Sequence, residues 1–290
     1  MKKLLAAAAV LATTTVAAGH ADAITNNYQV DNVHDFVGLM VALDDQGEFM
    51  WRCSGSLLED QVTFVTAGHC TDDNAPDAEG PVASARVYFQ QGAGANYDPE
   101  TEYDPISGYP DDCGVQPEFC REASIVDDYG FDDFAGFPDT HDVGVVILDE
   151  AYATPSGNYA TLAPVGTLDA LFTKRGLKDT TFLASGYGLS YSSPVGAVSF
   201  RSRLMGYGKL TNLVSNNNNG FNLQTNGNGK GNGGTCSGDS GGPIFYPADS
   251  NQIVAVTSFG MNSWCRGVDF SYRVDRQVIQ DWIFGPHPDA

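Results

Sequence analysis

Short apolar or alternating segments recur along the chain, and clusters of Gly, Pro, Asn and Asp separate them. The clearest segments are 36–43, 62–66, 85–90, 143–148, 181–185 and 253–259. Runs of this length bounded by turn residues are typical of β-strands, and many of them in succession indicate a β-sandwich or a barrel. Helical periodicity is nearly absent over most of the chain. The pattern predicts an all-β fold.

One helix is predicted near the C-terminus. The apolar positions there fall on one side of a helix: Val274, Val278 and Trp282, with Ile279 and Ile283 on the adjoining edge. Gly285 and Pro286 follow, and such residues commonly end a helix.

Two segments depart from the strand pattern. Residues 92–140 are rich in Asp, Pro, Gly and Tyr, and residues 215–234 are mostly Asn and Gly. By composition the second segment is expected to be a flexible surface loop.

The first 23 residues have the composition of a secretory signal peptide. Lys2 and Lys3 precede an uncharged run over 4–18, and small residues stand at Ala21 and Ala23. A membrane anchor is the alternative, but a run of about 15 residues is short for a span of about 20. We therefore expect residues 1–23 to be removed and residues 24–290 to form one secreted domain outside the membrane.

Six cysteines lie in the exported part of the chain: Cys53, Cys70, Cys113, Cys120, Cys236 and Cys265. An even number in an exported protein indicates three disulfides, and the sequence alone leaves most pairings open. Cys113 and Cys120 are close enough in sequence to close a small local loop. A zinc site is the competing interpretation, but paired C-x-x-C units are absent from the sequence, and no metal is expected.

The net charge of −21 comes from 36 acidic and 15 basic residues. Nucleic acids and anionic membrane surfaces require basic patches, so neither is an expected partner. No sign of an organic cofactor is found, and we expect a monomer.

The most specific motif is the run GDSGGP over residues 238–243. A nucleophilic serine needs a base for its proton and donors for the oxyanion that it creates. A turn dense in glycine exposes Ser240 and lets backbone N–H groups approach that oxygen. A glycine-rich turn with an incidental serine is the alternative.

Two further residues complete a possible catalytic set. His69 lies at the end of the predicted strand 62–66, beside Cys70, although a single histidine is more often structural than catalytic. Asp142 precedes the apolar segment 143–148, where a buried carboxylate could orient an imidazole.

TAGHC (66–70), HDVGVVIL (141–148) and GDSGGP (238–243), in the order His, Asp, Ser, resemble the chymotrypsin/trypsin family of serine proteases. The resemblance covers most of residues 24–284, with the two unusual segments as departures. It implies two six-stranded antiparallel β-barrels, an active site between them and a C-terminal helix. It also implies a serine endopeptidase that hydrolyses proteins or peptides with the triad His69, Asp142 and Ser240.

The resemblance assigns further roles by position. Gly238 and Ser240 would donate the oxyanion-hole N–H groups. Ser258, Phe259 and Gly260 would pair with the substrate backbone as an added strand, and Ser258 would also hydrogen-bond Asp142. The disulfides implied are Cys53–Cys70 beside the histidine and Cys236–Cys265 at the specificity pocket, which leaves Cys113 with Cys120.

Activation is expected to differ from that of typical family members. Their new N-terminus is released after a basic residue, and its ammonium pairs with the aspartate before the nucleophile. Here no basic residue precedes Ile24. The hypothesis is that signal peptidase itself releases the Ile24 ammonium, which then pairs with Asp239.

The specificity pocket is less well determined. In trypsin-like members an aspartate at the pocket base selects Lys and Arg, but here Gly234 and Thr235 stand at that place. Asp269 either presents a carboxylate to the pocket from the side or is a solvated loop residue. We expect a preference for bulky apolar residues or a mixed one.

Three alternatives compete with an active, metal-free protease. An α/β-hydrolase shares G-x-S-x-G but needs a catalytic histidine after the serine, where only His287 occurs. An inactive binding protein on the same fold usually lacks a triad member, whereas His69, Asp142 and Ser240 are all present here. Calcium could bind an acidic loop made of Asp72, Asp73, Asp77 and Glu79, but a solvated loop is favoured because the alternation of a dedicated calcium loop is missing.

Overall fold

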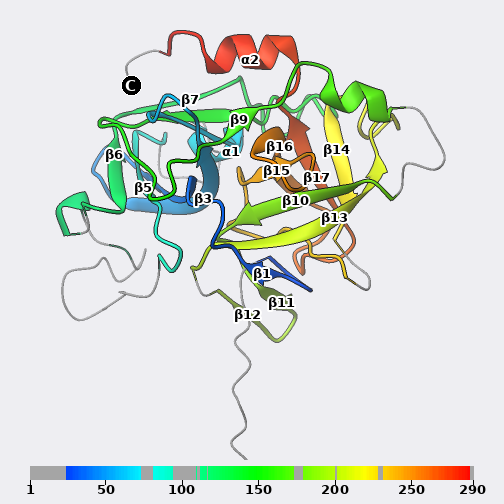
Figure 1. Cartoon of the computed structure of the whole chain (residues 1–290), viewed down its shortest axis with the longest axis horizontal. Helices are drawn as coiled ribbons and strands as arrows, with labels where there is room; N and C mark the ends of the chain where they lie inside the picture. The colour runs from blue at the N-terminus through cyan, green and yellow to red at the C-terminus, as the bar shows by residue number, and fades with distance from the viewer. Residues whose placement is uncertain are drawn as a thin grey trace, which may run out of the picture.

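The computed structural model describes residues 24–72, 81–93, 109, 112–115, 117–172, 179–199, 201–227 and 231–287. In this part of the chain strands dominate and helices are few and short (Figure 1). The helical elements are α1 (Gly68–Thr71), the 3-10 turns η1 (Cys113–Val115) and η2 (Thr167–Leu171), and α2 (Gln277–Ile283). No helix of the described residues is long and apolar enough to cross a membrane.

The N-terminal half of the chain forms a nearly closed antiparallel barrel. Its strands are β2 (Val37–Leu43), β3 (Phe49–Leu57), β4 (Thr63–Thr66), β5 (Ser84–Tyr88), β6 (Cys120–Ala123), β7 (Ile125–Asp128) and β8 (Gly144–Ile147). They are ordered β6-β5-β2-β3-β4-β8-β7. Only Ser124 separates β6 from β7, so the sheet corresponds to six strands, one of them interrupted.

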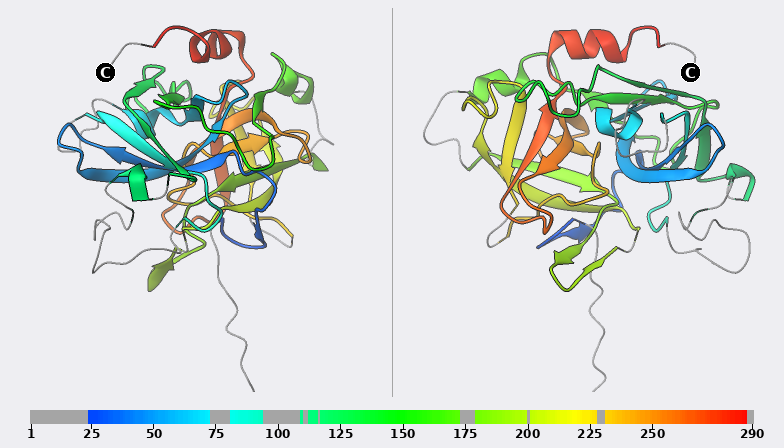
Figure 2. Two further views of the ribbon diagram at one scale, coloured as in Figure 1. Left: turned by 60° about the vertical axis from the view of Figure 1, so that its left-hand side comes forward. Right: turned by 180° about the vertical axis from the view of Figure 1, so that it is seen from behind.

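The C-terminal half forms a second barrel beside the first, as both views of Figure 2 show. Its strands are β1 (Gln29–Val30), β9 (Thr161–Leu162), β10 (Thr181–Gly186), β13 (Leu204–Asn212), β14 (Asn222–Asn226), β15 (Pro243–Phe245), β16 (Gln252–Gly260) and β17 (Val268–Arg273). The order β13-β10-β15-β16-β17-β14 closes on itself because β13 also pairs with β14. The hairpin of β11 (Tyr191–Ser193) and β12 (Gly196–Val198) stands outside this ring. The predicted all-β fold of two barrels is confirmed.

The predicted C-terminal helix exists, but its buried face differs from the prediction. Helix α2 begins only at Gln277, so Val274 lies before it, and Val278 is 48% exposed. Ile279 and Ile283 are the buried residues of the helix. Because the helix has seven residues, it presents a narrower apolar face than the longer periodic stretch suggested.

The prediction of a flexible surface loop over 215–234 is wrong for its central part. Residues 222–226 form β14, which pairs with β17 and β13. Asn218 and Asn222 are fully buried, and the Asn222 amide donates to the Pro138 carbonyl at 2.7 Å. Asparagine here serves as a hydrogen-bonding residue inside the fold, which composition alone did not reveal. Much of the other unusual segment, 94–108, lies outside the described residues.

A buried polar cluster fastens the N-terminal segment to the second barrel. Both Asp31 oxygens lie within 3.0 Å of His34 Nδ1, and the Ser185 hydroxyl of β10 donates to Asp31 at 2.6 Å. Arg203, just before β13, donates to the carbonyls of Val37 and Phe89 in the first barrel at 3.1 and 3.0 Å. These bonds tie the two barrels together.

Candidate active site

His69 and Asp142 come together because β4 and β8 are antiparallel neighbours. Their register pairs Thr66 with Gly144, so the end of β4 meets the start of β8. His69 follows β4 within α1, and Asp142 lies two residues before β8 begins. Gly144 is required at this junction, since a side chain there would come within 2.3 Å of the Thr71 hydroxyl.

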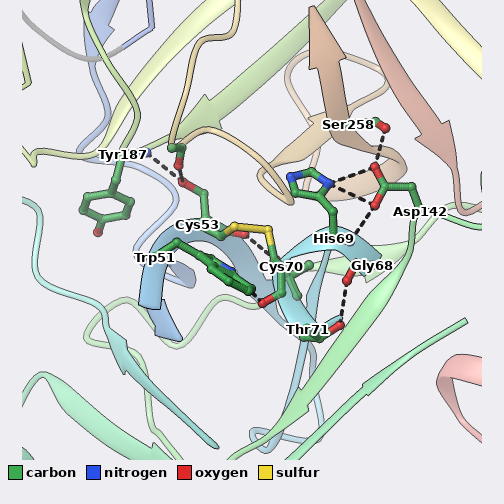
Figure 3. Close-up of a disulfide and its surroundings, with 12 residues drawn as sticks. Trp51, Cys53, Gly68, His69, Cys70, Thr71, Asp142, Tyr187 and Ser258 are labelled. Carbon is green, nitrogen blue, oxygen red and sulfur yellow. Dashed lines mark hydrogen bonds and ion pairs between the residues drawn. A yellow bond between two sulfur atoms is a disulfide. The ribbon is translucent and has the colours of Figure 1, made fainter. Parts of the chain in front are cut away.

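The two side chains form a tight pair, shown in Figure 3. His69 Nδ1 lies 3.0 Å from each carboxylate oxygen of Asp142, and the His69 backbone N–H donates to Oδ1 at 2.9 Å. The Ser258 hydroxyl from β16 donates to Asp142 Oδ2. Asp142 is fully buried, while His69 is partly exposed. The geometry fixes the imidazole with its Nδ1 toward the carboxylate and its Nε2 on the opposite side.

The electrostatics of the pair follow from this arrangement. Burial opposes the charged form of His69, but the charge and hydrogen bond of Asp142 outweigh it, so the pKa of His69 is raised. Burial would likewise raise the pKa of Asp142, but the imidazolium charge and the hydrogen bonds from His69 and Ser258 hold it below its usual value. Asp142 is therefore the negative group that stabilises a proton on His69.

Ser240 stands on a turn that only glycine neighbours permit. Gly238 and Gly241 have φ values of +94° and +76°. A side chain at Gly241 would come within 2.0 Å of the Thr66 hydroxyl and 2.4 Å of the Ser54 carbonyl. The turn is held by Ser54, whose N–H donates to the Ser240 carbonyl at 2.7 Å and whose hydroxyl donates to the Gly238 carbonyl at 2.8 Å.

The turn lies beside the residues that precede His69. The Cβ position of Gly241 is 2.6 Å from the Ala67 nitrogen, so the chain after Ser240 abuts the chain before His69. Both Ser240 and His69 lie in the described part of the chain, and no hydrogen bond joins the Ser240 hydroxyl to the His69 imidazole. Such bonds are often long before substrate binds. Among the described residues, no acceptor is found for the N–H groups of Gly238 and Ser240, and their role as oxyanion donors stays a prediction.

All six cysteines form disulfides with the expected pairing. The bonds are Cys53–Cys70, Cys113–Cys120 and Cys236–Cys265. Cys53 and Cys70 have their sulfur atoms close to His69, but these are bonded to each other and offer no thiolate to a zinc ion. The Trp51 indole donates to the Cys70 carbonyl at 3.1 Å and further fixes α1 beside the histidine (Figure 3).

A cavity of about 240 Å³ opens next to Ser240. Its lining includes Thr235, the wall formed by Ser258, Phe259 and Gly260, and the Cys236–Cys265 disulfide. Gly260 is exposed at the end of β16, and Phe259 is partly exposed. Most of the residues expected at the substrate site therefore surround one cavity.

Asp269 is not a solvated loop residue. It lies in β17, is 4% exposed, and accepts the Thr235 N–H at 3.1 Å through Oδ2. Oδ2 is also within 3.1 Å of the Cβ position of Gly234. Burial raises the pKa of Asp269 to about 7, despite the hydrogen bonds from Thr235. The carboxyl is thus placed behind Thr235 and Gly234, next to the cavity wall.

Ile24 and Asp239 are both fully buried. Thr25 and Gly234 exchange two backbone hydrogen bonds of 2.9 Å, which seat the segment after Ile24 against the pocket. The Asp239 carboxylate accepts the N–H groups of Gly188 and Cys236 at 2.8 and 2.9 Å. Burial raises the pKa of Asp239 to about 7, and the charge of Asp269 adds to the rise. In the uncleaved chain the Ile24 nitrogen is an amide, so its pairing with Asp239 stays a prediction.

Sequence reasoning missed several residues that shape the site. Ser54 supports the nucleophile turn, Phe131 packs 6.0 Å from the His69 ring, and Arg52 lies 3.7 Å from the Cβ position of Gly238. Ser54 directly follows Cys53 in the sequence, which was a usable signal. Phe131 and Arg52 come from a long loop and a strand without any motif. Of the possible calcium ligands, Asp72 is buried, and Asp73, Asp77 and Glu79 lie outside the described residues.

Several solved structures share this fold. HL collagenase is 22% identical with a TM-score of 0.58, and the match covers 90% of this chain and 96% of that one. Human heparin binding protein is 20% identical with a TM-score of 0.59, and the match covers 90% of this chain and 98% of that one. A scabies mite inactivated protease paralogue is 13% identical with a TM-score of 0.58, covering 93% and 100%. At these identities the likeness establishes the fold alone.

A search of curated protein sequences finds no match. The family model described as trypsin matches residues 136–283, slightly more than half of the chain. The matched region includes Asp142 and Ser240, and His69 lies before it. Together with the two barrels, this match shows that the chain belongs to the trypsin family of chymotrypsin-like serine proteases.

Proposed function

We propose that this protein is a secreted serine endopeptidase. The observation that carries the proposal is the buried Asp142–His69 pair, held by Ser258 and lying beside the glycine turn that presents Ser240. A carboxylate, an imidazole and a hydroxyl in this relation are the parts that acyl transfer requires.

In the proposed mechanism Ser240 Oγ attacks the carbonyl carbon of a peptide bond, and His69 Nε2 takes its proton. The N–H groups of Gly238 and Ser240 stabilise the negative oxygen of the tetrahedral intermediate. His69 then gives the proton to the departing amine, which leaves an acyl group on Ser240. Water, deprotonated by His69, attacks the carbonyl carbon of this ester. His69 then returns the proton to Ser240 Oγ as the bond from Oγ to the acyl group breaks, and the acid product leaves. Asp142 holds the imidazole in orientation and stabilises its charged form in both halves.

The cavity beside Ser240 would receive the side chain before the cleaved bond. Thr235 stands in its lining and Gly234 beside it, so a charged group is missing where a trypsin would have its aspartate. The nearby Asp269 accepts a backbone N–H and is buried, which raises the pKa of its carboxyl to about 7 and disfavours its charged form. These features favour bulky apolar side chains or a mixed preference.

An inactive binding protein is the second candidate function. The solved structures similar to this chain include one described as a heparin binding protein and one as an inactivated protease paralogue. The fold is therefore compatible with either function, and the distinction depends on whether Ser240 reacts.

The test of the proposed function is covalent labelling. The secreted protein is incubated with a fluorophosphonate, and its intact mass is measured before and after. We expect one adduct, located on Ser240 by peptide mapping and lost in His69→Ala, because without the base the hydroxyl is not activated. A folded, correctly processed protein that takes up no probe would contradict the proposal and favour the binding function.

We further propose that residues 24–290 form the mature, monomeric protease after signal peptidase removes 1–23. Ile24 and Asp239 are both buried, and burial raises the pKa of the Asp239 carboxyl to about 7 in the uncleaved chain. An ammonium against this carboxyl would favour its charged form. Breaking such a buried pair costs roughly 3–5 kcal/mol. The N-terminal sequence of the secreted protein should therefore begin at Ile24, and a mature N-terminus at any other residue would contradict this activation scheme.

A further inference from the structure

The segment 262–266 separates the cavity beside Ser240 from a second cavity of about 220 Å³. Its side chains are divided between the two: Asn262, Ser263 and Cys265 line the first cavity, and Trp264 and Arg266 line the second. The other walls of the second cavity come from residues 25–28 and from residues 190–192, where the hairpin β11–β12 begins. We name this second space the hairpin cavity, and the proposed mechanism does not use it.

Hydrogen bonds fix the walls of the hairpin cavity in place. Asn262 Oδ1 accepts the N–H groups of Trp264 and Arg266 at 3.1 and 3.3 Å, which holds the segment in a tight turn. The Ser192 hydroxyl of β11 donates to the Ser263 carbonyl at 2.9 Å and so fastens the hairpin to this turn. A cavity that is fixed in this way needs little further ordering when a ligand binds.

Three hydroxyl groups in the walls can only accept hydrogen bonds from a ligand. Ser190 and Ser192 each donate to a backbone carbonyl, at 3.1 and 2.9 Å, and Thr25 donates to one at 3.3 Å. A hydroxyl group has a single hydrogen to donate and two lone pairs that accept. Because these three hydrogens already have acceptors inside the protein, a ligand that contacts the oxygens must bring donors of its own.

Two aromatic side chains of the lining are open to solvent. Trp264 is 46% exposed and Tyr191 is 44% exposed. The face of an aromatic ring is negative, and it attracts C–H groups, which are weakly positive. A sugar ring has C–H groups on its faces and hydroxyl donors around its edge. It therefore matches both the aromatic side chains and the accepting oxygens of this cavity.

The hairpin cavity is positively charged, although the whole chain carries a net charge of −21. Arg266 is the only charged residue among the described residues that line it. Its backbone N–H and carbonyl both bond to Asn262, but in the described part of the chain no partner is found for its guanidinium. A guanidinium binds a carboxylate through two parallel hydrogen bonds. The charge thus favours a ligand that carries a carboxylate.

We propose that the hairpin cavity binds a sugar residue that carries a carboxylate, that is, a uronic acid. Its ring stacks on Trp264 or Tyr191, its hydroxyls donate to the three wall hydroxyls, and its carboxylate pairs with Arg266. The cavity is smaller than the roughly 300–1,000 Å³ that drug-sized ligands occupy, so it takes one sugar ring. The inference does not depend on the proposed function, because none of these side chains belongs to the triad.

The test is a ligand-observed NMR titration of the secreted protein with glucuronic acid and with glucose, which has a hydroxymethyl group in place of the carboxylate. For glucuronic acid we expect a Kd of about 1 mM, the affinity typical of a ligand of this size. Glucose should bind about fivefold more weakly, because Arg266 is exposed and an exposed ion pair contributes no more than this.

Two variants separate the contributions of charge and stacking. In Arg266→Gln, glucuronic acid should bind no more tightly than glucose, and the Kd of glucose should stay within about twofold. In Trp264→Ser, both Kd values should rise about tenfold, because about 55 Å² of apolar contact is lost.

Each variant has a matched control that should keep the wild-type Kd values. Lys209→Gln removes an exposed positive charge of β13, which is not part of the cavity lining. Met261→Ser removes a 62% exposed apolar side chain just before the segment 262–266, also outside the lining.

The methyl β-glycoside of glucuronic acid distinguishes two sources of the ligand. A Kd equal to that of the free acid shows that the site accepts the end of a polysaccharide, whereas binding of the free acid alone restricts the ligand to the free sugar. Both results support the inference, because the recognised chemistry is the same.

Three results would overturn the inference. The first is a wild-type protein that does not bind glucuronic acid, and the second is an Arg266→Gln variant that still prefers glucuronic acid to glucose. The third is phenylacetate binding as tightly as glucuronic acid, since the site would then take any apolar acid. If circular dichroism shows Trp264→Ser to be unfolded, Tyr191→Ser is titrated in its place with the same criterion. Labelling of Ser240 decides the proposed function separately.

Discussion

Replacing Ser240 with alanine is expected to lower kcat by about 10⁶-fold while the protein stays folded. The hydroxyl is the only group lost, and its oxygen is the nucleophile of the proposed reaction. The turn itself is held by backbone groups and Ser54, through the carbonyls of Ser240 and Gly238, and these bonds survive the substitution. The measurement is the steady-state hydrolysis of a peptide identified by library digestion, with circular dichroism to verify the fold.

The matched control for this variant is Ser250→Ala. Ser250 lies in a turn before β16, where its exposed hydroxyl donates to the Pro247 carbonyl. Its removal should leave kcat within about twofold. A Ser240→Ala protein that retains more than about a tenth of the wild-type activity would show that another residue attacks the substrate. This result would contradict the proposed mechanism.

Much of the fold could be predicted from hydrophobic patterning and turn residues. Segments such as 36–43, 181–185 and 253–259 became β2, β10 and β16 because alternating or apolar runs bury one or both faces of a strand. The pairing of Thr66 with Gly144 that joins His69 to Asp142 was not visible in this way, because strand register is a long-range property. The prediction that His69 and Asp142 act together came instead from the resemblance of three sequence motifs to those of the protease family.

Composition failed where polar residues are used inside the fold. The asparagine-rich segment contains a five-residue strand and two buried asparagines, whose side-chain NH₂ groups donate to Gln224 Oε1 and to the Pro138 carbonyl. Val278 was assigned to the buried face of the last helix, but α2 is too short to bury the whole stripe. Asp269 could not be placed from its neighbours alone, and its burial depends on pairing with Thr225 and Gly260 in the adjacent strands.

Substrate preference is harder to predict than the reaction, as the ring contacts among Phe131, Phe134, Phe137 and Phe259 beside His69 show. Short motifs predict a catalytic triad, because its chemistry demands specific residues in a specific order. The three phenylalanines of the loop between β7 and β8 recur every third residue in sequence, at positions 131, 134 and 137, but no motif connects them to Phe259. Their meeting depends on the loop conformation, including positive φ values at Asp133 and Phe134.

Replacing Asp142 with asparagine is expected to lower kcat by about 10⁴-fold. The carboxylate accepts three donors: the His69 N–H, the His69 Nδ1–H and the Ser258 hydroxyl. An amide NH₂ group facing His69 Nδ1 would favour the tautomer with its proton on Nε2, and that nitrogen could no longer accept the proton of Ser240. The near-identical shape of asparagine should preserve the fold.

The same variant makes a prediction about pH. His69 acts as a base only when neutral, so activity rises with pH through the pKa of His69, which Asp142 raises in the wild type. Without the negative charge that pKa falls, and the acid limb of the kcat/KM profile should move to lower pH. Asp149→Asn is the matched control, because this exposed carboxylate follows the other end of β8 and should change neither kcat nor the profile by more than about twofold. An Asp142→Asn enzyme with lowered kcat but an unmoved acid limb would show that the limb belongs to a group other than His69.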